Sequence, residues 1–580
     1  MALSCIKEQQ EILDAEEQSI LVTARPGRGK TTVALLLSER VIGGQEIAPW
    51  QNVLLLTFSR TAVYQIQQAS GQILDAGIRR QLCIATYHSF MWWLLSVFGR
   101  FHGLPCRLDV MRDTKARAAR MAAIQSAISE ADMPRFLARD LAAISYSEFA
   151  PLSLDLLRGS ENVRCMLRQR FPIVIVDEFQ DTNAEQWELI KTISQGSRLV
   201  CFADPDQMIF RWRGASGERL NQLCTERQAK SYSLENKCLR TGESEILAFA
   251  EAILDDKPGS IGERAKRRKR FLVAYPGHNA LGYYLKGVIR SFYSDYRRRG
   301  SQRPLPSIAV AAYSNESARV IQDALTSPDP SAQNVYRCAL LEGESDDALD
   351  ELIAHLAAWA AGGERWELVQ AVRLAGGMLV TDISNASGPL APLFAPEKLL
   401  SNRSQLKGTA KHVVELFEPI QASAATGHES IDLAVEAVSR LRDCAKSIGR
   451  RISEDDLEAC RSKMLRIVES QSTQSALSAM QALRAQLSAE RLRTDVLERV
   501  IPTRGIISST LHKLKGREFD YVCVVTRSGD TLRSKAEEES DARRLVYVAL
   551  TRARYDARIL YVKSKPCLLL DPYLTTSGYA

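Results

Sequence analysis

The chain has 580 residues, of which 45% are hydrophobic and 25% charged, and its formal net charge is +7. This length is too great for one hydrophobic core and predicts three or four domains of ordinary globular composition. The mild positive charge permits nucleic-acid binding without establishing it.

Cysteine usage and the absence of long apolar runs exclude several classes. The 12 cysteines include no C-x-x-C pair and the seven histidines are dispersed, so a zinc ribbon and a disulfide framework are not expected. The first 20 residues are polar and acidic, unlike a signal peptide. No apolar run approaches the roughly 18 residues that span a bilayer. We therefore expect a reduced, cytoplasmic protein with no membrane association.

Short apolar runs alternate with helical patterns in two regions, which is typical of buried parallel sheets. In such sheets ligands bind at the carboxyl ends of the strands. The first group of predicted strands is 19–24, 52–57, 173–176 and 198–202, and the second is 271–274, 308–311, 521–525 and 559–562.

Residues from about 96 to 165 and from about 346 to 500 lack this rhythm and read as mostly helical, and 471–500 is consistent with one long amphipathic helix. The sequence thus predicts an α/β protein with two parallel-sheet domains, each carrying a helical insertion. The expected order is first α/β domain 1–95, helical insertion 96–165, first α/β domain continued 166–232, second α/β domain 233–345, helical insertion 346–500 and second α/β domain continued 501–580.

A phosphate-binding loop follows the first predicted strand. Ala24-Arg-Pro-Gly-Arg-Gly-Lys-Thr31 reads as G-x-x-x-x-G-K-[ST] with Ala at its first position. Lys30 reaches the β- and γ-phosphates in such loops, and the Thr31 hydroxyl ligates Mg²⁺. A glycine turn before a helix is the alternative, but the strand–loop–helix order favours ATP binding. The expected binding residues are Ala24, Arg25, Pro26, Gly27, Arg28, Gly29, Lys30, Thr31 and Thr32.

The loop departs from the usual pattern at three positions. Arg25 and Arg28 stand where small residues are usual, and Pro26 removes one N–H donor. We expect nucleotide to bind, with unusual affinity or turnover.

A carboxylate pair follows the predicted strand 173–176, in Val174-Ile-Val-Asp-Glu-Phe-Gln-Asp-Thr182. Asp177 is expected to hold Mg²⁺ through water, and Glu178 to polarise the attacking water as a general base. An acidic pair after a strand is weak evidence by itself, whereas the full D-E-x-Q-D-T string is specific.

With this string the chain resembles the UvrD/Rep-type helicases of superfamily 1 over nearly its whole length. The matching motifs occur in the family's order. They are the Q motif at 7–13, motif Ia at 57–62, the following motif at 86–90, motif III at 203–215, motif V at 510–519 and motif VI at 543–553.

The resemblance implies two RecA-like domains with ATP and Mg²⁺ bound between them, and it assigns further roles. Gln9 reads the adenine edge, Gln207 senses the γ-phosphate and Glu518 holds the ribose. Arg552 and Arg240 act as arginine fingers from the second α/β domain.

Motif IV is the weakest match. Leu234-Glu-Asn-Lys-Cys-Leu-Arg240 displaces the Asn of the family's Asn-Tyr-Arg pattern, and Leu239 stands where an aromatic residue stacks on adenine. This departure predicts looser discrimination between ATP and GTP.

Four residues match the family's nucleic-acid contacts. The resemblance assigns base stacking to Phe58 and Trp212, and contacts with the sugar–phosphate backbone to His88 and His512. Aromatic residues in apolar strings are usually core residues, which is the alternative for Phe58. Trp212 lies between two arginines, an unusual setting for a core residue.

The predicted function is an ATP-dependent translocase and helicase that acts on single-stranded DNA and on junctions of duplex with single strands. The resemblance implies 3′-to-5′ movement. The alternative is a sensor of DNA ends or single strands that licenses a separate nuclease subunit. In size the chain resembles the helicase subunit of Gabija-type anti-phage systems, which would give it a role in antiviral defence.

Overall fold

The structure is a computed structural model. It describes residues 6–106, 108–111, 113–235, 245–257, 271–277, 280–300, 305–327, 336–340, 348–379, 390–394, 407–421, 426–444, 452, 454–469, 475–496, 504–526, 539–564, 568–570 and 573. The chain forms two compact units, and each draws on separate stretches of sequence. The sheet unit comprises Met1–Phe90, Ser160–Gly343 and Val500–Ala580, and the helical unit comprises Met91–Gly159 and Glu344–Arg499.

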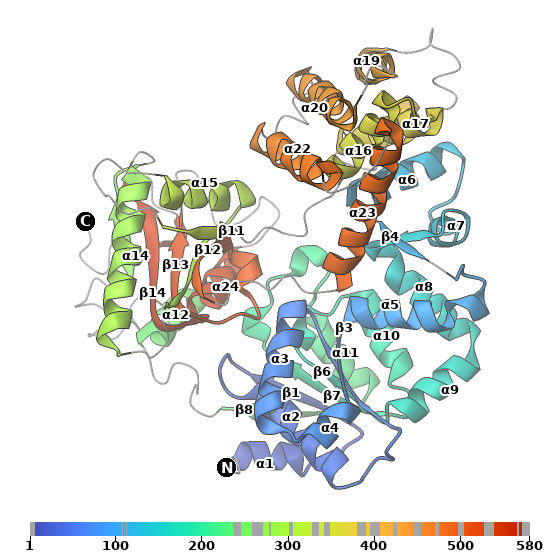
Figure 1. Ribbon diagram of the computed structural model, residues 1–580. Helices are drawn as coiled ribbons and strands as arrows, with labels where there is room; N and C mark the ends of the chain where they lie inside the picture. Colours follow the sequence, from blue (N-terminus) through green and yellow to red (C-terminus); the bar gives the residue numbers. More distant parts are fainter. Residues whose placement is uncertain are drawn as a thin grey trace. The chain divides into compact units, whose positions relative to one another are not determined.

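The sheet unit contains a first sheet of six parallel strands in the order β3-β2-β6-β7-β1-β8 (Figure 1). Its strands are β1 (Ser19–Ala24), β2 (Val53–Thr57), β3 (Leu82–Thr86), β6 (Ile173–Val176), β7 (Arg198–Ala203) and β8 (Lys230–Leu234). Its helices are α1 (Lys7–Leu13), α2 (Lys30–Gly43), α3 (Arg60–Ile73), α4 (Ala76–Gln81), α9 (Glu161–Arg170), α10 (Ala184–Ile193) and α11 (Glu218–Glu226). Because β7 pairs with both β1 and β6, the loops that follow these three strands meet at one edge of the sheet.

The second sheet of this unit is also parallel, in the order β11-β12-β10-β13-β14-β9. Alternate residues of β10 point to opposite faces: Ala309 and Ala311 pack with α12 and α24, whereas Ile308 and Val310 pack with α14 and α15. The strands are β9 (Leu272–Tyr275), β10 (Ser307–Ala312), β11 (Cys338–Leu340), β12 (Gly505–Thr510), β13 (Phe519–Val525) and β14 (Ala553–Val562). The helices are α12 (Glu245–Asp255), α14 (Leu281–Arg298), α15 (Asn315–Thr326) and α24 (Glu539–Leu550).

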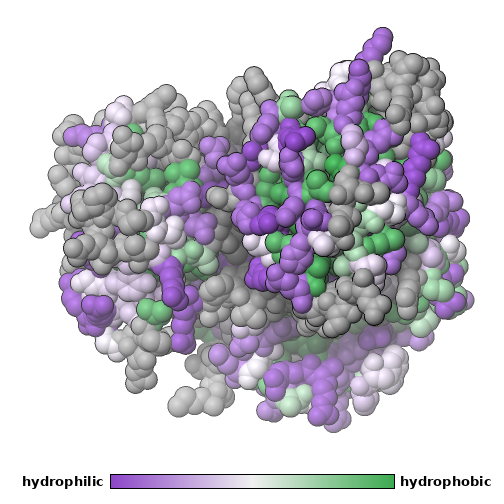
Figure 2. Space-filling view, turned by 45° about the horizontal axis from the view of Figure 1, so that its top comes forward, coloured by the Kyte–Doolittle hydropathy of each residue, from purple (hydrophilic) through white to green (hydrophobic). Residues whose placement is uncertain are grey.

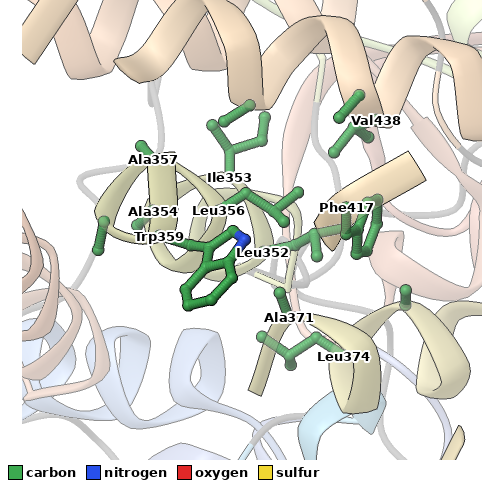
Figure 3. Packing of buried hydrophobic residues seen from close by; sticks show 14 of the residues in the cluster. Leu352, Ile353, Ala354, Leu356, Ala357, Trp359, Ala371, Leu374, Phe417 and Val438 are labelled. Carbon is green, nitrogen blue, oxygen red and sulfur yellow. The ribbon is translucent and has the colours of Figure 1, made fainter. Parts of the chain in front are cut away.

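The helical unit contains both insertions, and its largest hydrophobic core is formed by the later one. Trp359 lies in this core with Leu352, Phe417 and Val438 (Figure 3), and its indole N–H donates to the Glu418 carbonyl oxygen at 3.3 Å. The earlier insertion supplies α6 (Asp113–Gln125), α7 (Met133–Asp140), α8 (Tyr146–Gly159) and a two-stranded parallel sheet of β4 (Asp109–Met111) and β5 (Ala143–Ser145). The later insertion supplies α16 (Ala348–Ala360), α17 (Arg365–Leu379), α19 (Gly408–Phe417), α20 (Gly427–Cys444), α22 (Glu454–Glu469) and α23 (Ala476–Val496). The helix α5 (Tyr87–Phe98) begins in the sheet unit and ends in the helical unit.

The predicted α/β class with two parallel sheets is confirmed. All eight predicted strands are present, and those at 19–24 and 173–176 have the predicted bounds. Among the described residues, six strands were not predicted, namely β3, β4, β5, β8, β11 and β12, and β4 and β5 lie in the segment 96–165 that was expected to be mostly helical. The strand β8 lies at the sheet edge and exposes most of its residues, so it lacks the continuous apolar signal of a buried strand.

The surface mixes polar and apolar residues. On the face shown in Figure 2, hydrophilic residues separate smaller hydrophobic patches. None of the helices in the described part of the chain combines the length and the apolar character that crossing a bilayer requires.

Candidate nucleotide site and nucleic-acid interface

The phosphate loop joins β1 to α2. Gly27 and Gly29 adopt left-handed backbone conformations, with φ of 73° and 87°, which glycine reaches without strain. Gly29 is the N-cap of α2, so Lys30, Thr31 and Thr32 form the first helical turn. The helix N-terminus therefore presents N–H groups and a positive dipole end at this loop, as the predicted phosphate site requires.

Lys30 is held between the loop and the first sheet. Its Nζ donates to the carbonyl oxygen of Ala24 at 2.7 Å and lies 3.5 Å from Oδ2 of Asp204, which directly follows β7. Asp204 is 1% exposed. The buried carboxylate fixes the position of the ammonium group beside the loop.

The predicted carboxylate pair follows β6, next to the loop. Burial raises the pKa of Asp177 to about 7, and the charge of Glu178 adds to the rise. Burial also opposes ionisation of Glu178, but the positive charges of Lys515 and Lys30 outweigh it and lower the pKa of Glu178 to about 2. Glu178 is therefore ionised at neutral pH and suited to orient and polarise a water molecule.

The backbone of Glu178 is strained, with φ of 55° in the left-handed region, which is uncommon for a residue with a side chain. Gln180 donates from Nε2 to Oε2 of Glu178 at 2.5 Å and accepts from the backbone N–H of Asp204 at 2.9 Å. This amide fixes the carboxylate and joins the ends of β6 and β7. Strain held by such contacts is typical of functional sites.

A continuous polar chain links the two sheets. From Asp204, Oδ2 accepts a hydrogen bond from Nε2 of Gln207 at 2.5 Å, and Oε1 of Gln207 accepts from Arg552 at 2.7 Å. Gln207 and Arg552 are 2% and 3% exposed. Lys30 begins α2 beside the first sheet and Arg552 precedes β14 of the second sheet, and the two are thus joined through Asp204 and Gln207.

Lys515 is a functional candidate that the sequence reading did not single out. It lies in the loop between β12 and β13 of the second sheet, and its Nζ is 2.5 Å from Oδ2 of Asp181 and 3.9 Å from Oε2 of Glu178. It also donates to the carbonyl oxygen of Gln207. Its place within the motif V string was the only hint available from the sequence. That string contains several cations and does not show which of them reaches the acidic site.

The residues at this edge fit Mg²⁺ with a nucleotide. Thr31 supplies a hydroxyl and Asp177 a carboxylate, the hard oxygen donors that Mg²⁺ prefers, and a nearby cation would favour the ionised form of this buried acid. In the part of the chain that the structure describes, no three His, Cys, Asp or Glu side chains are grouped to hold a metal ion. Magnesium sites commonly use one or two carboxylates together with phosphate oxygens.

The remaining predicted nucleotide contacts lie at separate places. Gln9 is buried on α1 and its Oε1 accepts from the backbone N–H of Ile6 at 3.3 Å. Glu518 pairs with Arg554 at 2.9 Å. Arg240 and Leu239 lie outside the described residues.

The two unusual arginines of the phosphate loop both have partners. Arg25 donates from Nε to Asp206 at 3.1 Å and from Nη1 to Glu251 at 2.8 Å. Arg28 donates to the carbonyl oxygen of Leu234, the last residue of β8, at 3.2 Å. Both guanidinium groups are therefore held by hydrogen bonds to residues next to the loop.

Three of the four predicted nucleic-acid residues, Phe58, Trp212 and His512, lie close to Phe210. Phe58 stacks on Phe210 with ring centroids 4.7 Å apart, and His512 lies 6.4 Å from both Phe210 and Trp212. Trp212 is 58% exposed, and Arg213 lies 4.6 Å from its ring centroid. Phe58 thus has one face covered by another ring, whereas Trp212 offers accessible ring surface.

His88 lies in the same electrostatic environment. Burial, followed by the charges of Arg213 and Arg60, lowers the pKa of His88 to about 4. The imidazole is therefore neutral at physiological pH and can contact nucleic acid by a hydrogen bond rather than as a cation.

Comparisons with known proteins agree with this geometry. The UvrD/REP helicase N-terminal domain model matches residues 5–141 and 137–228, and the UvrD-like helicase C-terminal domain model matches 381–564. Together these matches cover more than half of the chain.

Three curated proteins illustrate the likeness. The ATP-dependent DNA helicase PcrA of Bacillus subtilis is 22% identical over 55% of this chain and 48% of its own length. DNA helicase II of Escherichia coli is 23% identical over 44% and 41%, respectively. The ATP-dependent DNA helicase Rep of Escherichia coli is 26% identical over 43% of each chain. The chain thus spans less than half of the length of these relatives.

Proposed function

Because the chain belongs to the UvrD/Rep helicase family, we propose that it is an ATP-driven motor that moves along single-stranded DNA and separates duplex strands. The observation that carries this proposal is the polar chain from Lys30 through Asp204 and Gln207 to Arg552. It connects a phosphate loop beside the first sheet to a buried arginine beside the second, which is the arrangement that a site responsive to nucleotide needs.

The chemistry is assigned to the residues that surround this chain of contacts. The loop backbone and Lys30 bind the phosphates of ATP, and Thr31 and Asp177 would hold Mg²⁺, which neutralises phosphate charge when bound. Glu178, fixed by Gln180, orients the attacking water. Arg552 stabilises charge in the transition state, a contribution of roughly 10³–10⁵ in rate for such arginines.

Coupling to DNA follows from one short segment. Gln207 accepts from Arg552, and Phe210 and Trp212 follow in the same segment within the aromatic cluster. A change at the γ-phosphate that moves Gln207 therefore displaces the surface on which bases stack. Alternating grip by these rings advances the strand, and we assign 3′-to-5′ polarity on the family resemblance.

The test uses purified protein with single-stranded DNA and with duplexes that carry a 3′ tail, a 5′ tail or no tail. We expect hydrolysis of ATP stimulated by single strands, and displacement from the 3′-tailed duplex. Lys30→Ala should abolish both, because it removes the ammonium group that binds the phosphates. Turnover retained by Lys30→Ala would overturn the assignment of the loop.

The same assay separates the motor from the alternative sensor. Robust hydrolysis on single strands without strand displacement would reject processive unwinding and favour a subunit that recognises DNA and licenses a separate nuclease. Displacement of 5′-tailed duplexes alone would overturn the proposed polarity.

A further inference from the structure

Arg25 occupies an unusual place for a long cation. It is the second residue of the phosphate loop and directly follows β1, beside the two glycines that give the loop its shape. A guanidinium carries five N–H donors and favours carboxylate and phosphate partners alike. A loop that binds phosphate therefore carries, besides Lys30, a second group that can bind the same charge.

The guanidinium of Arg25 binds two carboxylates, one beside the first sheet and one beside the second. Asp206, 3.1 Å from Nε, precedes Gln207 in the first sheet's site, and Glu251, 2.8 Å from Nη1, lies on α12 beside the second sheet. The three side chains are about one-third exposed, at 36%, 34% and 29% for Arg25, Asp206 and Glu251. They are accessible enough for partners to exchange.

The link to Glu251 reaches the element that carries Arg552. The helices α12 and α24 belong to one hydrophobic cluster, and α24 ends two residues before Arg552. Tyr547 on α24 is fully buried, and burial followed by the charge of Asp204 raises its pKa. The charges of Arg25, Asp206 and Glu251 also act on Tyr547, so this buried residue of α24 lies near the ion pairs of Arg25.

We propose that Arg25 is a positioning residue that exchanges between Glu251 and the phosphates of bound nucleotide, so that occupancy of the loop sets how firmly α12 is tied to it. This proposal rests on the proposed ATP site. Phosphate oxygens placed in the loop compete with Glu251 for the same N–H donors, and their binding weakens the tie. Hydrolysis and phosphate release restore it, which transmits the chemical state of the nucleotide to the helix pair that carries Arg552.

The test is a double-mutant cycle on the full chain, with a non-hydrolysable ATP analogue and Mg²⁺ as the probe. Glu251→Gln removes the competing carboxylate, so we expect the dissociation constant of the analogue to fall roughly three- to fivefold, the upper part of the range for a partly exposed charge pair. In an Arg25→Gln background the same substitution should change it less than about twofold. Arg25→Lys, which keeps the charge, should recover part of the Glu251 effect.

Asp255→Asn is the matched control, because Asp255 is another carboxylate on α12 and pairs with Lys257 at 3.8 Å rather than with Arg25. It should leave analogue binding unchanged in both backgrounds. Equal tightening by Glu251→Gln with and without Arg25 would show that Glu251 acts through its own field and would overturn the inference, as would no tightening at all. Analogue binding that depends on Lys30 but shows no coupling refutes only the role of Arg25, whereas no binding by the parent chain refutes the proposed function.

Discussion

Replacing Lys515 by methionine is expected to destabilise the sheet unit strongly. The Lys515 side chain is 6% exposed and its partner Asp181 is fully buried, so the variant leaves carboxylates in a protein interior without their nearest cation. Breaking a buried ion pair by removing one partner costs about 3–5 kcal/mol. Methionine keeps most of the apolar stem, which confines the change to the charge.

The cost must depend on pH, because the buried acid can take up a proton instead of staying charged. Burial raises the pKa of Asp181 to about 7 even beside Lys515, so the stability of the parent protein falls as pH rises towards 7 and then levels off. In the variant this pKa lies higher, and the loss of stability continues at about 1.4 kcal/mol per pH unit above 7. We expect the full cost at pH 8.5 and roughly 2 kcal/mol less at pH 7.

Urea unfolding at pH 7 and pH 8.5, followed by tryptophan fluorescence, measures both quantities, because Trp187 packs edge-on against Phe179 near this site. Adding Asp181→Asn should recover much of the loss by removing the stranded charge. Lys513→Met is the control, since Lys513 donates to Asn315 at 2.9 Å rather than to the acidic cluster. A loss below about 1 kcal/mol, or an equal loss at both pH values, would refute the reasoning.

Three further predictions concern the site and its surroundings. Arg552→Lys keeps the charge but loses the forked geometry, so kcat for ATP should fall about 10³-fold or more, and a decrease below tenfold would contradict its role as an arginine finger. Trp212→Ala should weaken single-stranded DNA binding by about 1–3 kcal/mol in a fluorescence anisotropy titration, and unchanged affinity would count against base stacking. The pKa of His88 falls from 6.5 to about 4 on folding, so the folded state binds fewer protons and stability decreases as pH drops through this window. Between pH 7 and pH 5 the parent should lose about 2 kcal/mol more than His88→Gln in urea unfolding, and identical slopes would reject the shift.

The sequence predicted those parts of the fold whose physics is local. The strands β1 and β6 are buried along almost their entire length, so their continuous apolar runs mark both ends. The edge strand β8, Lys-Ser-Tyr-Ser-Leu, consists mostly of polar residues and was not predicted. It forms a strand through its pairing with β1. The short strands β4 and β5 lie within a segment that was predicted to be helical. They were missed because three-residue strands carry no periodic signal.

The candidate site divides in the same way. Lys30 and Glu178 were predicted from strings in which residue type and spacing define the chemistry, and Gln207 was predicted from the family resemblance. Lys515 and Glu251 were not given roles, because their contacts join segments hundreds of residues apart and depend on how the two sheets pack within one unit. Arg25 was recognised as unusual from the sequence, but only the structure supplied its partners.

The division of the helical unit between two stretches of chain has a consequence for biosynthesis. All strands of the first sheet have been synthesised once Leu234 has been added, so this sheet can form during translation. One face of α6 must wait for the later insertion, because its buried Met121 packs against Phe394. At ~5–20 residues per second, synthesis from Met121 to Phe394 takes about 14 to 55 seconds. Throughout that time the face of α6 that carries Ala118 and Met121 lacks Phe394, so we expect chaperones to bind the nascent chain at this face.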